Sequence, residues 1–163
     1  MGSMDLVYNI ARRVVPSRED AQDLVQETYL RAFRACQEHR RPRKVEPWLA
    51  TICLNLARSR HRSRARRPDP APLDDAATIA STEDPERDAM AALDAQSLYR
   101  AMWRLPEGQR IALTLVDLVG LGTAEAAQAM GTPRGTVLSR LHRGRKALAT
   151  MLAGAEEETE RGR

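Results

Sequence analysis

The sequence is poor in aromatic side chains, which make up 4% of its 163 residues and include a single phenylalanine. A large core filled by aromatic rings is therefore excluded, and the abundance of alanine and leucine favours small helical bundles. The chain also lacks any run approaching the ~18 to 20 apolar residues that cross a bilayer, and its N-terminus has no secretory signal pattern. We expect an all-α protein that works in the cytoplasm.

Cysteine is also scarce, since only Cys36 and Cys53 occur and no disulfide framework is evident. Together with His39 and His61, the two cysteines would make a zinc-binding set. Both cysteines, however, lie on or near apolar stripes, which favours buried thiols over zinc ligands. The sequence contains no Ser/His/Asp set, no phosphate-cradling glycine loop and no paired acids in an apolar cleft. We therefore expect no catalysis, no metal, no cofactor and no small-molecule substrate.

Charge is present in two blocks of opposite sign, which the formal net charge of +4 conceals. Residues 40–67 contain ten lysines and arginines and one acid, whereas residues 68–97 contain eight acids and one base. An even distribution of acidic and basic residues along the chain would indicate only that the protein is soluble. The block pattern predicts that one segment binds an anion and that the next avoids or mimics one.

The most informative stretch is 123–152, TAEAAQAMGTPRGTVLSRLHRGRKALATML. A short helix capped by Thr123 would end at Gly131, which allows a tight turn, and Thr132 with Pro133 would start a second helix. The second helix has a basic face opposite an apolar stripe. That stripe is Val137, Leu141, Leu148 and Leu152. The pattern is typical of a DNA-reading helix-turn-helix, although an ordinary helical hairpin with a solvated face shares it.

The N-terminal third predicts two helices, 4–15 and 17–37, separated by Pro16. Gly2 and Ser3 before Met4 are typical of a cloning remnant, so the expected fold begins at Met4 and native residues are expected to be missing ahead of it. The second helix would be capped by Ser17. Its expected buried stripe is Ala21, Leu24, Val25, Thr28, Ala32, Phe33 and Cys36.

A line of acids follows another face of that second helix. Asp20, Asp23 and Glu27 lie at i, i+3 and i+7, with Gln26 beside them. Acids in a first turn suit the helix dipole, which explains Asp20 but explains Glu27 less well. The line is therefore a candidate contact surface.

A third helix is expected from Pro47 and runs into RSRHRSRARR, residues 58–67, where six of ten positions are arginine. Its expected buried stripe is Trp48, Leu49, Ile52 and Leu56. So many arginines cannot all find local carboxylates, and phosphate neutralisation explains them better than a solvated charge run does. Trp48 and the nearby amides add the means to hold unstacked bases.

Residues 68–84 contain three prolines, small residues and acids, which predicts an extended linker. The expected architecture is two small helical bundles joined by this flexible acidic linker, the second ending in the helix-turn-helix. The expected divisions are 4–67, the linker 68–84, 85–152 and a fraying tail 153–163.

Two separated parts of the chain resemble one family. Residues 20–34, DAQDLVQETYLRAFR, and 48–67, WLATICLNLARSRHRSRARR, resemble region two of sigma-70 class RNA polymerase sigma factors, and residues 105–148 resemble their region four. With only a linker between them, the layout is similar to that of the extracytoplasmic-function (ECF) group. The resemblance implies promoter-specific transcription initiation, with core RNA polymerase, promoter DNA and an anti-sigma factor as partners.

The resemblance also implies a role for each surface. The acidic face would dock on the coiled coil of the clamp of the largest polymerase subunit, through Asp20, Asp23, Gln26 and Glu27. The third helix would melt and hold the -10 DNA, through Trp48, Asn55, Arg58, Ser59, Arg62 and Arg66. The helix-turn-helix would read the -35 duplex, through Arg134, Thr136, Ser139, Arg140, His142, Arg143 and Lys146.

Three alternatives stay open at this point. A stand-alone helix-turn-helix regulator would bind duplex DNA by itself, but would need neither the acidic face nor the acidic linker. Asn55 would cap the end of the third helix instead of pairing with an unstacked base. A free protein would be controlled by its synthesis instead of by an anti-sigma factor whose helix buries apolar rims of both bundles.

Overall fold

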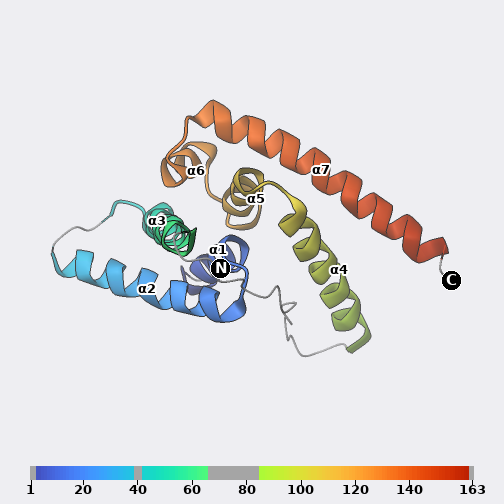
Figure 1. The fold of residues 1–163 in the computed structure, drawn as a ribbon, viewed down its shortest axis with the longest axis horizontal. Coiled ribbons are helices and arrows are strands. Elements are labelled where there is room, and N and C mark those ends of the chain that lie inside the picture. Colours follow the sequence, from blue (N-terminus) through green and yellow to red (C-terminus); the bar gives the residue numbers. More distant parts are fainter. Residues whose placement is uncertain (1–2, 39–41, 66–84, 162–163) are drawn as a thin grey trace.

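The computed structural model describes residues 3–38, 42–65 and 85–161, with side chains described for 4–38, 42–63 and 95–154. Seven α-helices and one π-helical segment make up these ranges, and no strand occurs within them. The helices form two groups, α1–α3 and α4–α7, which we call the N-terminal and C-terminal bundles (Figure 1). The expected all-α class is confirmed, while the expected linker, 68–84, lies wholly outside the described residues.

The N-terminal bundle consists of α1 (Ser3–Val14), α2 (Arg18–Gln37) and α3 (Val45–Ala65), each packed on the other two. As expected, Ser17 caps α2, and its hydroxyl oxygen accepts the Asp20 N–H at 3.0 Å. Thr28 is fully buried and satisfies its hydroxyl by donating to the Leu24 carbonyl at 2.6 Å. The core between the helices includes Leu6, Val7, Ile10, Ala21, Leu24, Cys53, Leu54 and Leu56.

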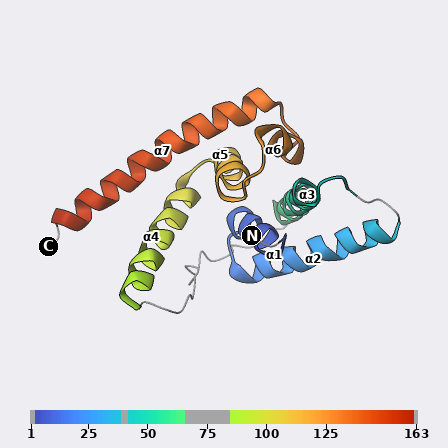
Figure 2. The same cartoon turned by 180° about the vertical axis from the view of Figure 1, so that it is seen from behind.

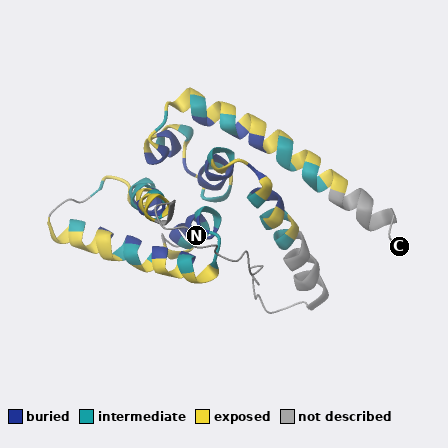
Figure 3. Ribbon diagram, in the orientation of Figure 1, coloured by how far each residue is buried: buried dark blue, intermediate teal, exposed yellow. Residues whose placement is uncertain are grey.

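Two residues expected in the buried stripe of α2 are exposed. Phe33 is 62% exposed, and Cys36 is exposed as well. The row of α2 that α1 and α3 cover is centred on Thr28, and at 100° per residue Phe33 points about 140° away from it. Cys36 lies in the last turns of α2, where exposed residues predominate (Figure 3).

The C-terminal bundle consists of α4 (Pro85–Arg104), α5 (Glu107–Leu113), the π-helical segment η1 (Thr114–Leu118), α6 (Thr123–Met130) and α7 (Arg134–Arg161). Its core includes Met102, Leu105, Ile111, Ala112, Leu115, Met130, Val137 and Leu141. The wide turn of η1 is closed by a hydrogen bond from the Val119 N–H to the Thr114 carbonyl at 2.9 Å.

The expected helix-turn-helix is present as α6 and α7. Gly131 ends α6 in the left-handed conformation, with φ 62°, which a residue without Cβ adopts at little cost. Thr123 was expected to cap α6, but it is the first helical residue and the N-cap is Gly122. Glu125 Oε2 accepts the Gly122 N–H at 3.0 Å. The second helix is also longer than expected, since α7 continues to Arg161 instead of ending at residue 152.

The two bundles pack against each other. α1 contacts α5 and η1, and α3 contacts α6. Both views of the ribbon show α1 beside α5 and α3 beside α6 (Figures 1 and 2). The buried side chains of both bundles form one continuous apolar core. None of the described helices is both long and apolar enough to cross a membrane.

Candidate nucleic-acid and partner interfaces

The acidic line of α2 divides into two parts in the structure. Asp23 and Gln26 are exposed on the side of the helix opposite Thr28, whereas Asp20 and Glu27 are half-buried on the flank toward α3. The division follows from 100° per residue, which places Asp23 and Gln26 within about 40° of the outward direction.

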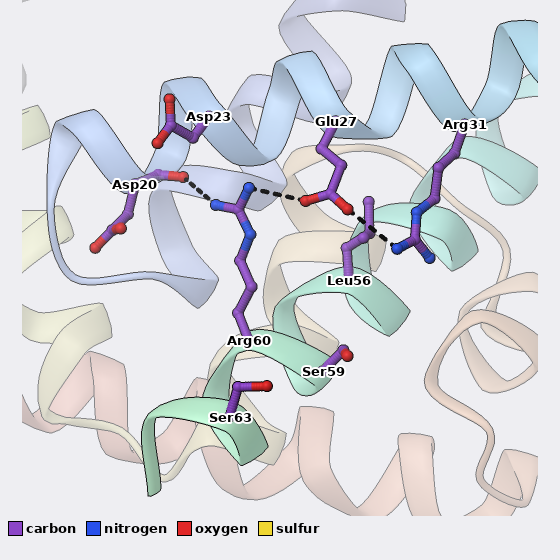
Figure 4. A pocket seen from close by; sticks show the side chains of 8 residues that line it. All are labelled: Asp20, Asp23, Glu27, Arg31, Leu56, Ser59, Arg60 and Ser63. Atoms are coloured by element: carbon purple, nitrogen blue, oxygen red, sulfur yellow. Dashed lines mark hydrogen bonds and ion pairs between the residues drawn. The ribbon is translucent and has the colours of Figure 1, made fainter. Parts of the chain in front are cut away.

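Glu27 is held by two arginines of its own bundle (Figure 4). Arg60 Nη2 of α3 lies 2.9 Å from Glu27 Oε2, and Arg31 Nη2 lies 3.0 Å from Oε1. The hydrogen bond from Arg60 is the main cause that lowers the pKa of Glu27, aided by the charges of both arginines. Arg60 also donates to the backbone carbonyl of Asp20 at 3.3 Å. Glu27 therefore ties α2 to α3, and only part of its carboxylate faces a partner.

The outward side of α2 also carries two exposed apolar residues. Phe33 was expected in the buried stripe, and Leu30 was not singled out from the sequence. Leu30 is 56% exposed and Phe33 is 62% exposed, and both lie on the same side as Asp23 and Gln26. Asp23 has no ion-pair partner among the described residues. We call this set, Asp23, Gln26, Leu30 and Phe33, the outer face of α2. Helix angles measured from the buried residues Thr28 and Ala32 would have identified this outer face from the sequence.

The residues expected at -10 DNA follow one side of α3, which we call the strand face. Asn55 and Arg62 are exposed on it, and Ser59 turns toward the hollow of about 360 Å³ beside α2. α3 continues to Ala65, so Asn55 lies in the helix interior and does not cap its end. Arg66 lies outside the described residues.

Trp48 lies in a groove of about 460 Å³ between the bundles. The N-terminal bundle lines it with Pro42, Arg43, Lys44, Pro47, Trp48 and Thr51, and α6 lines it with Glu125 and Gln128. Lys44 and Glu125 form an ion pair across the groove, which raises the pKa of Lys44 and lowers that of Glu125. The indole is half-buried in this position.

Arg58 is already engaged in the structure. Its Nη2 donates to the Met130 carbonyl at the end of α6 at 2.7 Å, and its Nη1 lies 3.5 Å from Asn55 Oδ1. A carbonyl at a helix C-terminus carries partial negative charge and suits a guanidinium. One of the residues expected to hold the -10 strand is thus occupied by the helix-turn-helix.

The outward side of α7 carries most of the residues expected at the -35 duplex. We call these, Thr136, Ser139, His142, Arg143 and Lys146, the duplex face. Ser139, His142, Arg143 and Lys146 are exposed, and Thr136 is half-buried. Within the helix, Arg143 Nε donates to the Ser139 carbonyl at 3.3 Å, and Arg143 Nη2 lies 3.5 Å from Ser139 Oγ.

Two further residues expected at the duplex are held at the margins of α7. Arg134 Nε donates to Thr123 Oγ1 at 2.9 Å and ties the start of α7 to the start of α6. Arg140 lies over α5, where a Cβ added to Gly108 would come within 3.0 Å of its Nε. Both are therefore less available to DNA than Arg143.

Residues that the sequence analysis did not single out fix the direction of α7. Arg145 makes a two-pronged ion pair with Asp117 of η1, with Nη2–Oδ1 at 2.6 Å and Nε–Oδ2 at 3.0 Å. Gly144 packs on α5 so closely that a Cβ there would lie 3.0 Å from Leu113 Cδ1. Both contacts join residues that are far apart in the sequence, so no local sequence pattern indicated them.

Two protein families match the chain in the same order as its two bundles. Residues 3–67 match the family described as Sigma-70 region 2, and residues 95–148 match the family described as Sigma-70, region 4. The first match covers α1–α3, and the second includes the helix-turn-helix.

Curated relatives match over most of the chain. The ECF RNA polymerase sigma factor SigE of Mycolicibacterium smegmatis is 38% identical over 156 residues, which cover 95% of this chain and 60% of that protein. The ECF RNA polymerase sigma-E factor of Salmonella typhimurium is 33% identical over 150 residues, which cover 87% of this chain and 78% of that protein. This chain therefore spans 60% to 78% of the length of these two relatives.

Solved structures match over both bundles. The sigma factor RpoE in complex with the anti-sigma factor NepR, from Bartonella quintana, aligns with a TM-score of 0.78 at 26% identity, covering 93% of this chain and 92% of that chain. CnrH in complex with the cytosolic domain of CnrY aligns with a TM-score of 0.61 at 25% identity, covering 92% and 82%.

Proposed function

We propose that this chain, which belongs to the extracytoplasmic-function (ECF) group of sigma-70 RNA polymerase sigma factors, directs core RNA polymerase to specific promoters. The observation that carries the proposal is the presence of three separate outward surfaces in one chain: the outer face of α2, the strand face of α3 and the duplex face of α7. A protein that only binds duplex DNA needs the last of them alone.

The outer face of α2 is the proposed contact with the clamp of the largest polymerase subunit. Asp23 and Gln26 offer a carboxylate and an amide to a basic partner, and Leu30 with Phe33 add exposed apolar area that association would bury. Asp20 and Glu27 lie at the flank of this surface. Their role in docking is secondary, because Arg60 and Arg31 already neutralise the Glu27 carboxylate. A mixed polar and apolar face of this kind suits a protein partner better than DNA.

The strand face is the proposed site for melted -10 DNA. An exposed amide at Asn55 has both a donor and an acceptor for the edge of an unstacked base, and the Trp48 ring offers a stacking surface. Arg58, Arg62 and Arg66 would hold phosphates, which positions the strand without reading its sequence. Ser59 would add a hydroxyl contact from the flank.

The duplex face is the proposed reader of the -35 element. Arg143 is exposed and can present a bidentate fork to a guanine, which makes it the leading base contact. His142, Ser139, Thr136 and Lys146 would contact neighbouring bases and phosphates. Arg134 and Arg140 would act mainly by fixing α7, since Arg134 is hydrogen-bonded to Thr123 of α6 and Arg140 lies against Gly108 of α5.

The proposal includes a protein inhibitor and no chemistry of the chain's own. An anti-sigma factor is the proposed inhibitory partner, supported by the likeness of both bundles to RpoE in complex with the anti-sigma factor NepR. We propose no catalytic step, cofactor or small-molecule substrate, and a cytoplasmic location with the polymerase. The division into 4–67, a linker 68–84, 85–152 and a tail 153–163 also stays a prediction.

A reconstitution with purified components tests the proposed function. The chain is mixed with core RNA polymerase and labelled promoter fragments in which the -35 or the -10 sequence is intact or scrambled. We expect a stable, heparin-resistant complex that needs the core enzyme and both intact elements. Full sequence-specific binding by the chain alone, with no effect of the core enzyme, would instead establish the stand-alone regulator.

A further inference from the structure

We propose that Leu138 of α7 is a further specificity-determining residue, whose apolar side chain recognises the C5-methyl group of a thymine in the -35 duplex. The inference rests on the proposed function, because it requires α7 to enter the major groove of that element. It adds to the proposed function one chemical group of the DNA that offers no hydrogen bond and that the polar residues of the duplex face therefore do not select.

Leu138 is the large apolar side chain that the helix-turn-helix leaves exposed. It is 48% exposed, and no other leucine, valine or methionine of the described segment 123–152 is in the exposed class. Val137 and Leu141 on either side of it are buried, and they belong to the apolar stripe that holds α7 on its bundle. Core packing therefore does not account for the exposed half of the Leu138 side chain.

The position of Leu138 along α7 favours contact with bases. It is the fifth residue of the helix, and the N-terminal residues of a recognition helix are those that contact base edges. At 100° per residue it points about 40° away from His142, a member of the duplex face. One turn earlier, Gly135 leaves room beside it, since a Cβ added there would meet no atom within 4 Å.

A helix in the major groove presents its flanks to the DNA as well as its outermost row. An α-helix with its side chains is about 10 to 12 Å across, and the major groove is about 12 Å wide, so the helix fills the groove. Leu138 lies on the flank between the buried stripe and the duplex face, and its side chain therefore faces one wall of the groove.

The arginines on the same flank are engaged by neighbouring helices. Arg134, one turn before Leu138, donates through Nε to Thr123 Oγ1 of α6 at 2.9 Å. Arg145, two turns after Leu138, is paired with both carboxylate oxygens of Asp117 in η1. Both arginines point within about 40° of Leu138. Because their guanidiniums are directed to α6 and η1, the isobutyl group of Leu138 is what this flank offers to the DNA.

The chemistry of the groove edges then selects the base. Leucine has no hydrogen-bond donor or acceptor, and the methyl group of thymine is the apolar group that an unmodified major groove presents. Contact between the two removes apolar surface from water, whereas an amino or carbonyl edge against Leu138 would lose its water without a new partner. Leu138 therefore favours a thymine at the pair that it contacts, and 5-methylcytosine presents the same methyl group.

Removal of single methyl groups from the DNA tests the contact. The complex of the intact chain with core RNA polymerase first selects its preferred -35 element from randomised promoter fragments. Each thymine of that element is then replaced by deoxyuridine, which keeps the base pair and removes only the methyl group. We expect one position at which this replacement weakens binding about fourfold, the effect of one buried methyl group. There, 5-methyldeoxycytidine should bind more tightly than deoxycytidine by a similar factor.

Variants of the chain then assign the methyl dependence to one side chain. Leu138→Ala should bind the thymine and the deoxyuridine promoters equally, whereas Leu138→Met, which stays apolar, should keep the difference. Arg143→Ala should weaken binding to both promoters and preserve the fourfold ratio, because its contact is separate from the methyl group. Met4→Ala is the matched control, since Met4 is an exposed apolar residue of α1 outside the three proposed faces, and it should change neither affinity.

The outcomes separate this inference from the proposed function. A methyl dependence that persists in Leu138→Ala, or a selected -35 element in which no position responds to the loss of a methyl group, would overturn the role of Leu138 alone. Leu138→Gln, which keeps the length of the side chain and replaces its apolar end by an amide, repeats the test in a second variant, and thermal unfolding shows that each variant is folded. Selection of no -35 sequence at all by the native complex would instead refute the proposed function.

Discussion

Charge reversal at Asp23 and at Glu27 should have different consequences, although both are acids on α2. Asp23 is exposed and without an ion pair in the described structure, so Asp23→Arg should change the free energy of unfolding by less than about 0.5 kcal/mol. Glu27 bridges Arg60 and Arg31, and an arginine in its place would set three cations together.

The size of the Glu27 effect follows from its exposure. The Glu27 and Arg60 side chains are 36% and 30% exposed, so solvent screens the pair and its loss should cost only about 0.5 to 1 kcal/mol. Repulsion in Glu27→Arg adds a similar amount, for a total of about 1 to 2 kcal/mol. At about 2 to 4 °C per kcal/mol, the melting temperature should fall by about 4 °C.

Thermal and urea unfolding measure these differences, and co-purification with core polymerase measures docking. Asp23→Arg should lose polymerase binding with an unchanged melting temperature, whereas Glu27→Gln should lose stability and keep most of the binding. Equal destabilisation by Asp23→Arg and Glu27→Arg would refute the division of the acidic line. Normal polymerase binding by Asp23→Arg would refute the docking role.

The dependence of stability on pH gives a second readout of Glu27. Its pKa is lower in the folded protein than the ordinary value of 4.5, so its contribution to stability is complete above that value and is lost as pH falls through the folded-state pKa. The free energy of unfolding of the native chain should therefore decline more steeply below pH 4.5 than that of Glu27→Gln. Parallel curves for the two proteins would contradict the ion-pair geometry.

Asn55→Ala should alter discrimination at one -10 position, whereas Arg62→Ala should weaken all promoters alike and flatten the salt dependence, as permanganate probing of melting on variant promoters measures; uniform loss for Asn55→Ala would exclude base reading. Arg143→Ala should lose about 1 to 3 kcal/mol of discrimination at the -35 element in footprinting, and an unchanged preference would exclude it as a base contact. Gly144→Ala should destabilise the chain by about 1 to 3 kcal/mol in urea unfolding, because its Cβ would meet Leu113 Cδ1 at 3.0 Å; a neutral result would mean that α7 can shift at no cost.

Local features of the fold could be predicted from local sequence. Ser17 caps α2, Gly131 turns the chain between α6 and α7, and the apolar period of α7 buries Val137 and Leu141, all through contacts within a few residues. The error at Phe33 had a local cause too. The expected stripe is wider than the buried row, because α2 is covered by two neighbouring helices and buries only the row centred on Thr28.

Contacts between distant residues could not be predicted in the same way. Nothing near Arg58 indicates that its guanidinium binds the Met130 carbonyl, and nothing near Arg110 indicates that it binds the end of α1. An arginine in a basic helix suits phosphate, carboxylate or a helix C-terminus equally well. Only the packing of the bundles decides which of these partners an arginine binds. The sequence therefore indicated the candidate residues but not the groups that they contact in the folded chain.

Run-off transcription with purified core RNA polymerase tests the central claim most directly. Templates carry matched -35 and -10 elements selected for this chain, or the same elements with one scrambled, and Asp23→Arg serves as the docking variant. We predict a defined transcript that needs the native chain and both elements and that Asp23→Arg does not support. A transcript independent of the added chain, or none from any template despite normal folding, would contradict the assignment of this chain as a promoter-directing subunit.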